Sequence, residues 1–220
     1  MPNNPSRLFG TNESFKDIEI NEKQGRELAR KGSRAELLSA IRSIGVKPPK
    51  AFLKLNDPKY SLRREEYGGI GCAIQASVDL RSEFARLVRM HEIIPKNSPK
   101  PYALIVDRES YRVHGYAMEF IPGKSLAHYF YSQPEAARAY LKSAVRLVKE
   151  LHANGFAHHD LDPVNMMITP KGKVVLIDPD PTVSGASPAS FDVKAICRMH
   201  NQLNAWMMEK DRLQKVPKVA

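Results

Sequence analysis

The spacing of apolar residues along the chain predicts three helices. In each of these segments an apolar side chain recurs at every third or fourth position, as on the buried face of a helix: 79–94, 132–152 and 191–208. Asp79 is a candidate N-cap for the first helix, and Pro95 ends it. Ser132 and Glu135 stand at capping-box spacing at the start of the second. The predicted inner face of the third helix consists of Ile196, Met199, Leu203 and Trp206.

Shorter apolar runs predict strands between the helices. We expect three single strands and one hairpin, in that order, over 51–55, 103–106, 113–120 and the pair 166–168 and 174–177. Residues 56–77 show no clear pattern and hold a charged stretch followed by the cluster Gly68-Gly69-Ile70-Gly71. The predicted helices and strands together indicate an α+β fold. No apolar run approaches the length of 18 residues that a membrane span needs, so we expect no membrane span.

The composition is that of a globular chain. Of 220 residues, 42% are hydrophobic and 26% are charged, which suits one domain or two small lobes without a disulfide scaffold. Cys72 and Cys197 are too few for a disulfide framework, and their spacing is not that of metal ligands. The polar segment 1–27 is expected to be a mobile leader, and its lack of a Sec-type signal peptide favours a cytoplasmic protein.

The chain is basic. Its net charge of +10 favours an acidic partner, such as a nucleotide phosphate, an acidic protein, a nucleic acid or a lipid surface. The basic residues are scattered, with no basic run and no basic–aromatic repeat, so the charge by itself does not favour nucleic acid. A basic surface that serves only solubility explains the same charge equally well.

The residues that carry chemistry lie between positions 158 and 180. Phosphoryl transfer needs one carboxylate near the attacking hydroxyl, and an amide oxygen with a second carboxylate to hold Mg²⁺. Asp160, Asn165 and Asp178 would supply these groups. The predicted hairpin would return the chain so that Asp178 faces Asn165 across one metal ion. A polar loop that matches by chance is the alternative.

This segment resembles the protein-kinase superfamily. Residues 158–165 match its H-x-D-x-x-x-x-N catalytic loop, and Asp178 stands thirteen positions after Asn165, as the aspartate of the D-F-G segment does. The resemblance implies ATP and Mg²⁺ as cofactors. It also implies that Asp160 is the catalytic base and that Asn165 and Asp178 are the metal ligands.

The same resemblance implies phosphate-binding residues earlier in the chain. Lys54, in a predicted strand, resembles the lysine that contacts the α and β phosphates, and Glu83 resembles its ion-pair partner. The 29 positions between them exceed the usual spacing of the family, which implies an insertion and leaves Glu65 and Glu66 as other partners. Surface salt bridging is the alternative for Lys54 and Glu83.

Two further matches would complete the nucleotide site. Glu119 and Ile121 resemble the hinge between kinase lobes, where the carbonyl of the first and the amide of the second would bond the adenine edge. Gly32 and Ser33 lie at a suitable distance before Lys54 for the nucleotide-covering loop, although this stretch holds a single glycine.

Departures from the family pattern indicate an atypical member. Asp162 replaces a phosphate-contacting Lys, His159 replaces an Arg that pairs with an activation-loop phosphate, and Pro179-Asp180 replaces Phe-Gly. Asp192 resembles the helix carboxylate that braces the catalytic loop, and an ordinary carboxylate at a helix N-terminus is the alternative. Asp192 comes only fourteen positions after Asp178, and 28 residues follow Asp192.

So short a C-terminal half resembles the RIO-type kinases and the minimal kinases that bacteria deliver into host cells by type III secretion. The second resemblance implies delivery into a host cell as the alternative to a cytoplasmic location. The resemblance implies a two-lobed fold, with a small β-rich N-lobe over 28–118 and a truncated, mainly helical C-lobe over 119–220. The expected function is an atypical Ser/Thr protein kinase with a protein substrate and an activating protein partner. The alternatives are a small-molecule kinase and a pseudokinase that binds a protein.

Overall fold

The structure is a computed structural model, and it describes most of the chain from residue 79 onward and shorter segments before it. The described residues are 18–20, 42, 50–56, 63–67, 70–75, 79–107, 109–110, 112–180 and 188–214. The predicted loop at Gly32 and Ser33 lies outside them. The chain divides into two compact units, the first formed by Met1–Val88 with Pro99–Phe120 and the second by Arg89–Ser98 with Ile121–Ala220.

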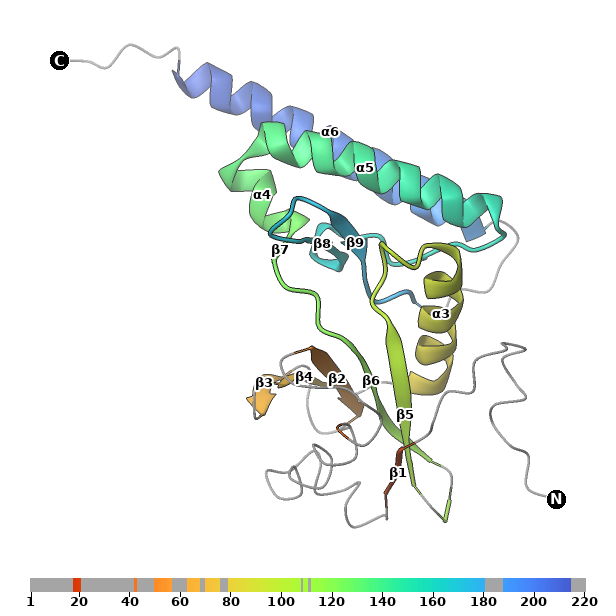
Figure 1. Ribbon diagram of the computed structural model, residues 1–220. Coiled ribbons are helices and arrows are strands. Elements are labelled where there is room, and N and C mark those ends of the chain that lie inside the picture. Colours follow the sequence, from red (N-terminus) through yellow and green to blue (C-terminus); the bar gives the residue numbers. More distant parts are fainter. Residues whose placement is uncertain are drawn as a thin grey trace. The chain divides into compact units, whose positions relative to one another are not determined.

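Unit 1 is built on a six-stranded sheet (Figure 1). Its strand order is β1-β5-β6-β2-β4-β3, in which β1 pairs parallel with β5 and β2 pairs parallel with β4, and the other neighbours are antiparallel. The strands are β1 (Ile18–Ile20), β2 (Ala51–Asn56), β3 (Arg63–Tyr67), β4 (Ile70–Gln75), β5 (Pro101–Asp107) and β6 (Val113–Glu119). The three strands predicted for this part of the chain are confirmed as β2, β5 and β6. The sequence did not predict β1, which lies inside the segment expected to be a leader.

The antiparallel pair β3–β4 fills the part of the sequence that showed no pattern. It accounts for the long interval between Lys54 and Glu83, because both strands lie between these residues in the chain. β4 pairs with β2 in a register that places Ala73 beside Lys54. The charged sequence Arg-Arg-Glu-Glu of β3 hid a strand, and β3 forms one edge of the sheet, where charged residues discourage pairing with other chains.

Helix α3 (Leu80–Ile93) is the predicted first helix, and its N-cap is confirmed. The Asp79 carboxylate accepts a hydrogen bond from the Ser82 N–H (2.9 Å), which satisfies one of the free donors of the first turn. Phe84 packs its ring against Tyr116 of β6, with ring centroids 5.6 Å apart. Tyr116 lies opposite Lys54 in the sheet, so α3 covers the face from which Lys54 projects.

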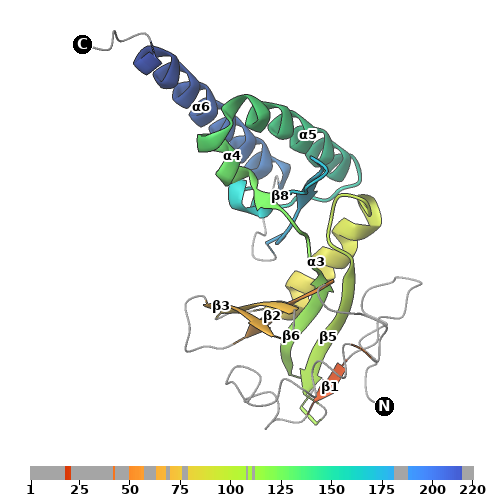
Figure 2. The same cartoon turned by 60° about the vertical axis from the view of Figure 1, so that its left-hand side comes forward.

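Unit 2 combines three helices with a small antiparallel sheet of order β7-β8-β9 (Figure 2). Its elements are β7 (Lys124–Ser125), α4 (Leu126–Ser132), α5 (Pro134–Ala153), the short 3-10 helix η2 (Pro163–Asn165), β8 (Met166–Ile168), β9 (Val174–Leu176) and α6 (Pro188–Gln214). Helices α5 and α6 lie side by side in both views. The predicted β8–β9 hairpin is confirmed, whereas β7 and α4 were not predicted.

The start of α5 differs from the prediction. Ser132 and Glu135 form no capping box, because Ser132 belongs to the last turn of α4 and its hydroxyl donates to the carbonyl of His128 (2.8 Å). The residue before α5 is Gln133, and Pro134 takes the first helical position. Proline suits that position because it has no N–H to satisfy and its φ is already helical. The predicted buried face is correct, and it consists of Ala137, Leu141, Ala144, Val148 and Leu151.

Helix α6 is longer than predicted at both ends, and one predicted core residue is not in the core. Met199 and Leu203 are buried, but the Trp206 side chain is 40% exposed. Its ring lies nearly perpendicular to the Tyr131 ring at the end of α4, with ring centroids 5.5 Å apart. The inner face of α6 therefore ends before Trp206. No helix in the described part of the chain is long and apolar enough to cross a membrane.

Candidate active site

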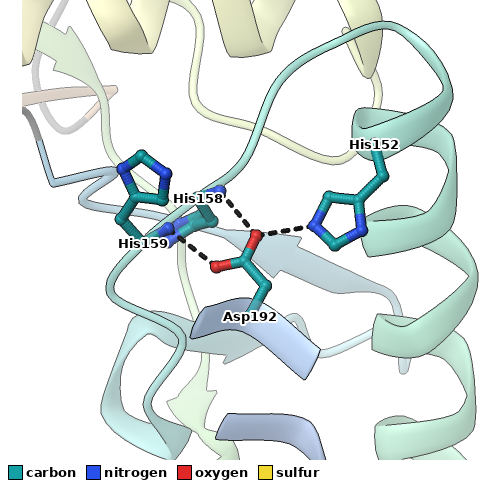
Figure 3. A network of polar contacts seen from close by, with 4 residues as sticks. All are labelled: His152, His158, His159 and Asp192. Atoms are coloured by element: carbon teal, nitrogen blue, oxygen red, sulfur yellow. Dashed lines mark hydrogen bonds and ion pairs between the residues drawn. The ribbon is translucent and has the colours of Figure 1, made fainter. Parts of the chain in front are cut away.

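A buried carboxylate from α6 holds the catalytic-loop segment of unit 2 (Figure 3). The Asp192 side chain is fully buried, and its two oxygens accept hydrogen bonds from the backbone N–H groups of His158 (2.7 Å) and His159 (2.8 Å). Asp192 therefore braces the loop, as the sequence predicted. It lies too far inside the helix, four positions after its first residue, to serve only as an end-capping charge.

His152 is a third partner of this carboxylate, and no pattern in the sequence singled it out. It lies in the last turn of α5, and its Nε2 is 2.9 Å from Oδ2 of Asp192. Figure 3 shows the imidazole on one side of the carboxylate and the two loop amides on the other. A buried carboxylate with three hydrogen-bond partners is far less costly than an unpaired one. The network joins α5, α6 and the loop.

Asp160 and Asn165 are in direct contact. The Asn165 amide Nδ2 donates to the Asp160 carboxylate (2.7 Å) and also to the Asp160 backbone carbonyl (3.1 Å). Asn165 is buried at the end of η2, so its side chain fixes the position of the predicted base. With Nδ2 bound in this way, the Asn165 oxygen Oδ1 is the atom left for a cation.

Asp162 has a structural role that its family position did not reveal. Its carboxylate accepts from the Val164 N–H (3.0 Å), and its carbonyl accepts from the Asn165 N–H (2.9 Å). It is thus the N-cap of η2, with Pro163 at the first helical position. The aspartate that stands in place of a lysine shapes the turn that presents Asn165.

Backbone hydrogen bonds bring Asp178 to the same loop. The N–H of Ile177, just before Asp178, donates to the carbonyl of Asn165 (3.0 Å), and the N–H of Asp180 donates to the carbonyl of His158 (3.0 Å). Asp178 and His159 both have a positive φ, of 55° and 70°. Aspartate and histidine are among the residues that tolerate this left-handed conformation, which is concentrated at functional sites. The three residues predicted for catalysis and metal binding are therefore assembled within unit 2.

Partial burial and the neighbouring carboxylates together make Asp160 a stronger base than an ordinary aspartate. Its pKa is raised, first by partial removal from water and then by the negative charges of Asp180, Asp162 and Asp178. The hydrogen bond from Asn165 opposes this rise. A raised pKa suits a carboxylate that must receive a proton, and a bound cation would offset part of the repulsion.

The donor set at this loop fits Mg²⁺. Asn165 Oδ1 and the Asp178 carboxylate are hard oxygen ligands, and magnesium commonly takes one or two protein ligands and completes its shell with water and phosphate oxygens. Among the described residues there is no group of three or more His, Cys, Asp or Glu side chains arranged to hold a metal by themselves. The two oxygen donors therefore fit a cation that completes its shell with other oxygens.

Unit 1 holds the predicted pair of Lys54 and Glu83. The Lys54 Nζ lies 2.9 Å from Glu83 Oε2, and the two side chains are only 9% and 14% exposed. An ion pair this far from solvent is not a surface salt bridge, which rules out the alternative interpretation. The other proposed partners, Glu65 and Glu66, belong to β3 at the sheet edge.

One glycine in each unit stands where the backbone has no room for a side chain, and the sequence did not single out either of them. A side chain at Gly115 of β6 would place its Cβ 2.5 Å from the Lys54 carbonyl, so β2 and β6 approach closely only because position 115 is glycine. Gly123 has a φ of 135°, and a Cβ there would collide with the backbone of Ile168. Both positions require glycine for space or conformation.

The predicted hinge residues lie where the chain passes from one unit to the other. Glu119 ends β6, and its N–H donates to the Lys100 carbonyl (2.8 Å) while its carboxylate accepts from the Lys100 N–H (3.1 Å). The N–H of Phe120 donates to the carbonyl of Lys50 (2.9 Å). Ile121 is the first residue of this part of unit 2. Their role toward an adenine ring stays a prediction.

The α+β fold and the loop built around Asp160 define a protein of the protein-kinase-like class. Within that class the chain belongs to the RIO domain family, whose match covers residues 65–211. The predicted fold class and the predicted kinase-like membership are both confirmed.

Curated relatives agree with this class over parts of the chain. The chain is similar to the cell cycle protein kinase DBF2 of Candida albicans, with 41% identity over 28% of this chain and 9% of the relative. It is 31% identical to the serine/threonine-protein kinase greatwall of Xenopus laevis over 42% of this chain and 13% of the relative. It is 27% identical to the serine/threonine-protein kinase OXI1 of Arabidopsis thaliana over 46% of this chain and 29% of the relative. The chain thus spans less than a third of each of these relatives.

Proposed function

We propose that this protein is a Mg-ATP-dependent kinase that transfers the γ-phosphoryl group to a serine or threonine hydroxyl of a protein. The observation that carries the proposal is a set of hydrogen bonds that joins Asn165 to Asp160 and to the residue before Asp178. The buried Asp192 holds the same loop through its backbone amides. A protein acceptor is supported by the names of the relatives, several of which are serine/threonine-protein kinases.

The proposal gives each residue of the loop one task. Asn165 and Asp178 would hold Mg²⁺, which supplies charge neutralisation for the phosphate oxygens. Asp160 would orient the acceptor hydroxyl and receive its proton. The hydroxyl oxygen then forms a bond to the γ-phosphorus while the bond from that phosphorus to the ADP oxygen breaks.

Residues earlier in the chain would bind the rest of the nucleotide. Lys54, held by Glu83, would contact the α and β phosphates. The Glu119 carbonyl and the Ile121 amide would bond the adenine edge. Lys54 is nearly buried, and the Glu83 carboxylate orients its ammonium.

A small-molecule acceptor is the second candidate. Asp162 favours it, because this residue caps η2 and provides no positive charge beside the phosphates. ATP consumption in the presence of one metabolite from a panel, without labelling of any protein, would support this candidate over a protein acceptor.

The deciding experiment is transfer of label from γ-labelled ATP with Mg²⁺, to generic protein substrates and to the purified chain alone. Asp178→Asn should lower the rate by more than about 100-fold, since a lost metal ligand removes several kcal/mol of transition-state stabilisation. Asp79→Asn is the matched control, because it makes the same chemical change at an exposed N-cap where asparagine also caps. Equal rates for Asp178→Asn and the wild type would contradict the proposal.

Label transfer that is absent in every variant would be followed by calorimetry with Mg-ATP. Binding that weakens in Asp178→Asn supports the nucleotide site and points to a missing substrate or activating partner. Lack of any binding by the wild-type protein would overturn the kinase proposal in favour of a protein-binding pseudokinase.

A further inference from the structure

We infer that Asn97 is a positioning residue for Asp178, because it holds the outer edge of the strand that leads to this carboxylate. Asn97 lies between α3 and β5, in the part of unit 2 formed by Arg89–Ser98. The inference rests on the metal-binding role proposed above for Asp178. No motif in the sequence drew attention to Asn97.

The contact is a pair of hydrogen bonds that imitates a neighbouring strand. The Leu176 N–H donates to the Asn97 backbone carbonyl (2.9 Å), and the Asn97 side-chain Nδ2 donates to the Val174 carbonyl (2.7 Å). β9 is at the edge of its sheet, with β8 on its other side. A strand residue would use its backbone N–H and C=O for such a pair, and here the side-chain amide takes the place of the N–H.

Asn97 is itself held firmly at the end of α3. Its N–H donates to the Ile94 carbonyl (2.8 Å), which also accepts from the hydroxyl of the next residue, Ser98 (3.1 Å). Ser98 is 3% exposed, and its hydroxyl oxygen lies 3.0 Å from His91 Nδ1. The edge of β9 is thus bound to a tight turn rather than to a loose loop.

Two residues, Leu176 and Ile177, connect the contact of Asn97 to Asp178. Leu176 is bound on the outer side by Asn97, and Ile177 is bound on the inner side by the carbonyl of Asn165. These two successive amides fix the chain just before Asp178, whose backbone has a positive φ of 55°. Without Asn97 the strand is free on one side, and the carboxylate direction is less well defined. Groups that orient metal ligands usually matter for metal affinity by about 10–100-fold.

The test compares Asn97→Asp with Thr169→Val. Asn97→Asp keeps the size of the side chain and replaces the donor by an oxygen that repels the Val174 carbonyl. Thr169→Val is the matched control, because it removes another side-chain hydrogen bond of the same hairpin, from the Lys173 N–H (3.1 Å), at the turn away from Asp178. Two quantities are measured: the hydrogen-exchange rate of the Leu176 amide, and the Mg²⁺ concentration that gives half-maximal phosphoryl transfer.

For Asn97→Asp we expect faster exchange at Leu176 and a half-maximal Mg²⁺ concentration about tenfold higher. The rate at saturating Mg²⁺ should change much less, because the ligand is misplaced rather than removed. Thr169→Val should match the wild type in both quantities. Asn97→Ala removes the donor without adding repulsion, and it should lie between Asn97→Asp and the wild type; it carries the test if Asn97→Asp fails to fold.

Unchanged exchange at Leu176 would overturn the inference whether or not the protein is a kinase. Faster exchange with an unchanged Mg²⁺ requirement, or the same increase in Thr169→Val, would overturn the positioning role while leaving the kinase proposal intact. If Asp178→Asn transfers phosphate with the Mg²⁺ dependence of the wild type, the proposed function fails, and the role of Asn97 toward metal fails with it.

Discussion

The two units place their candidate functional residues by different physical means. In unit 1 a contact between oppositely charged side chains, Lys54 and Glu83, joins β2 to α3. In unit 2 the loop around Asp160 is held mainly by side chains that bind backbone groups, with Asp192 on two amides and Asp162 capping η2. A side-chain pair can be replaced as a pair, whereas a side chain that serves the backbone has no substitute. Mutations should therefore affect the two units differently.

The largest effect is expected at Asp192. Asp192→Ala removes the acceptor of two loop amides and leaves them without their partner in a buried place, and it also removes the partner of His152. Breaking a buried charged network of this kind costs about 3–5 kcal/mol of unfolding free energy. Urea denaturation would measure it. A loss as small as that of an exposed control, Glu150→Ala on α5, would show that the loop does not depend on this carboxylate.

A smaller loss of stability is expected at the ion pair of unit 1, and a second substitution should restore most of it. Lys54→Met leaves the Glu83 carboxylate nearly buried without its cation and should cost about 1–3 kcal/mol of unfolding free energy. The double variant Lys54→Met with Glu83→Leu should recover most of that stability, because neither charge is then left alone. ATP binding by calorimetry should remain weak in both variants. A double variant as unstable as the single one would contradict the comparison.

The smallest effect on stability is expected at Asp160, where the substitution should raise the free energy of unfolding rather than lower it. The raised pKa of Asp160 means that the folded protein binds its proton more tightly than the unfolded chain does. The stability from this group is therefore present at acid pH and is lost as the pH rises through the raised pKa. Asp160→Asn should abolish transfer and yet raise the unfolding free energy at pH 7, by about 0.5 kcal/mol or less.

Thermal unfolding at several pH values checks this sign. The gain of Asp160→Asn over the wild type should vanish below the ordinary pKa range of aspartate, where the wild-type carboxyl is protonated in both states. The control is Asp162→Asn, which keeps a capping side chain and removes one of the charges that act on Asp160. A variant at position 160 that is less stable than the wild type at pH 7 would mean that the carboxylate supports the fold.

The sequence predicted unit 2 better than unit 1, and the reason lies in the range of the contacts. Asp160 and Asn165 are five positions apart, and a short hairpin returns the chain to Asp178, so their relation is visible as a motif. Lys54 and Glu83 could be paired only by resemblance. The strands β3 and β4 between them were missed, because β3 is a charged edge strand with no hydrophobic alternation.

Other features have no local signal in the sequence. Asn97 and Val174 are 77 positions apart, and His152 reaches Asp192 across 40. Gly115 is required only because β2 approaches β6 at that point. The capping-box prediction at Ser132 failed for a similar reason, since Pro134 and the preceding short helix α4 decide where α5 begins. Such contacts depend on the whole fold rather than on spacing along the chain.

The position of Trp206 has a practical consequence for spectroscopy. It is the only tryptophan of the chain, it is partly exposed, and its ring meets Tyr131 of α4. Its fluorescence therefore reports on the contact between α4 and α6 alone. Excitation of this one residue would follow the melting of unit 2 without interference from unit 1, with no dye attached to the protein.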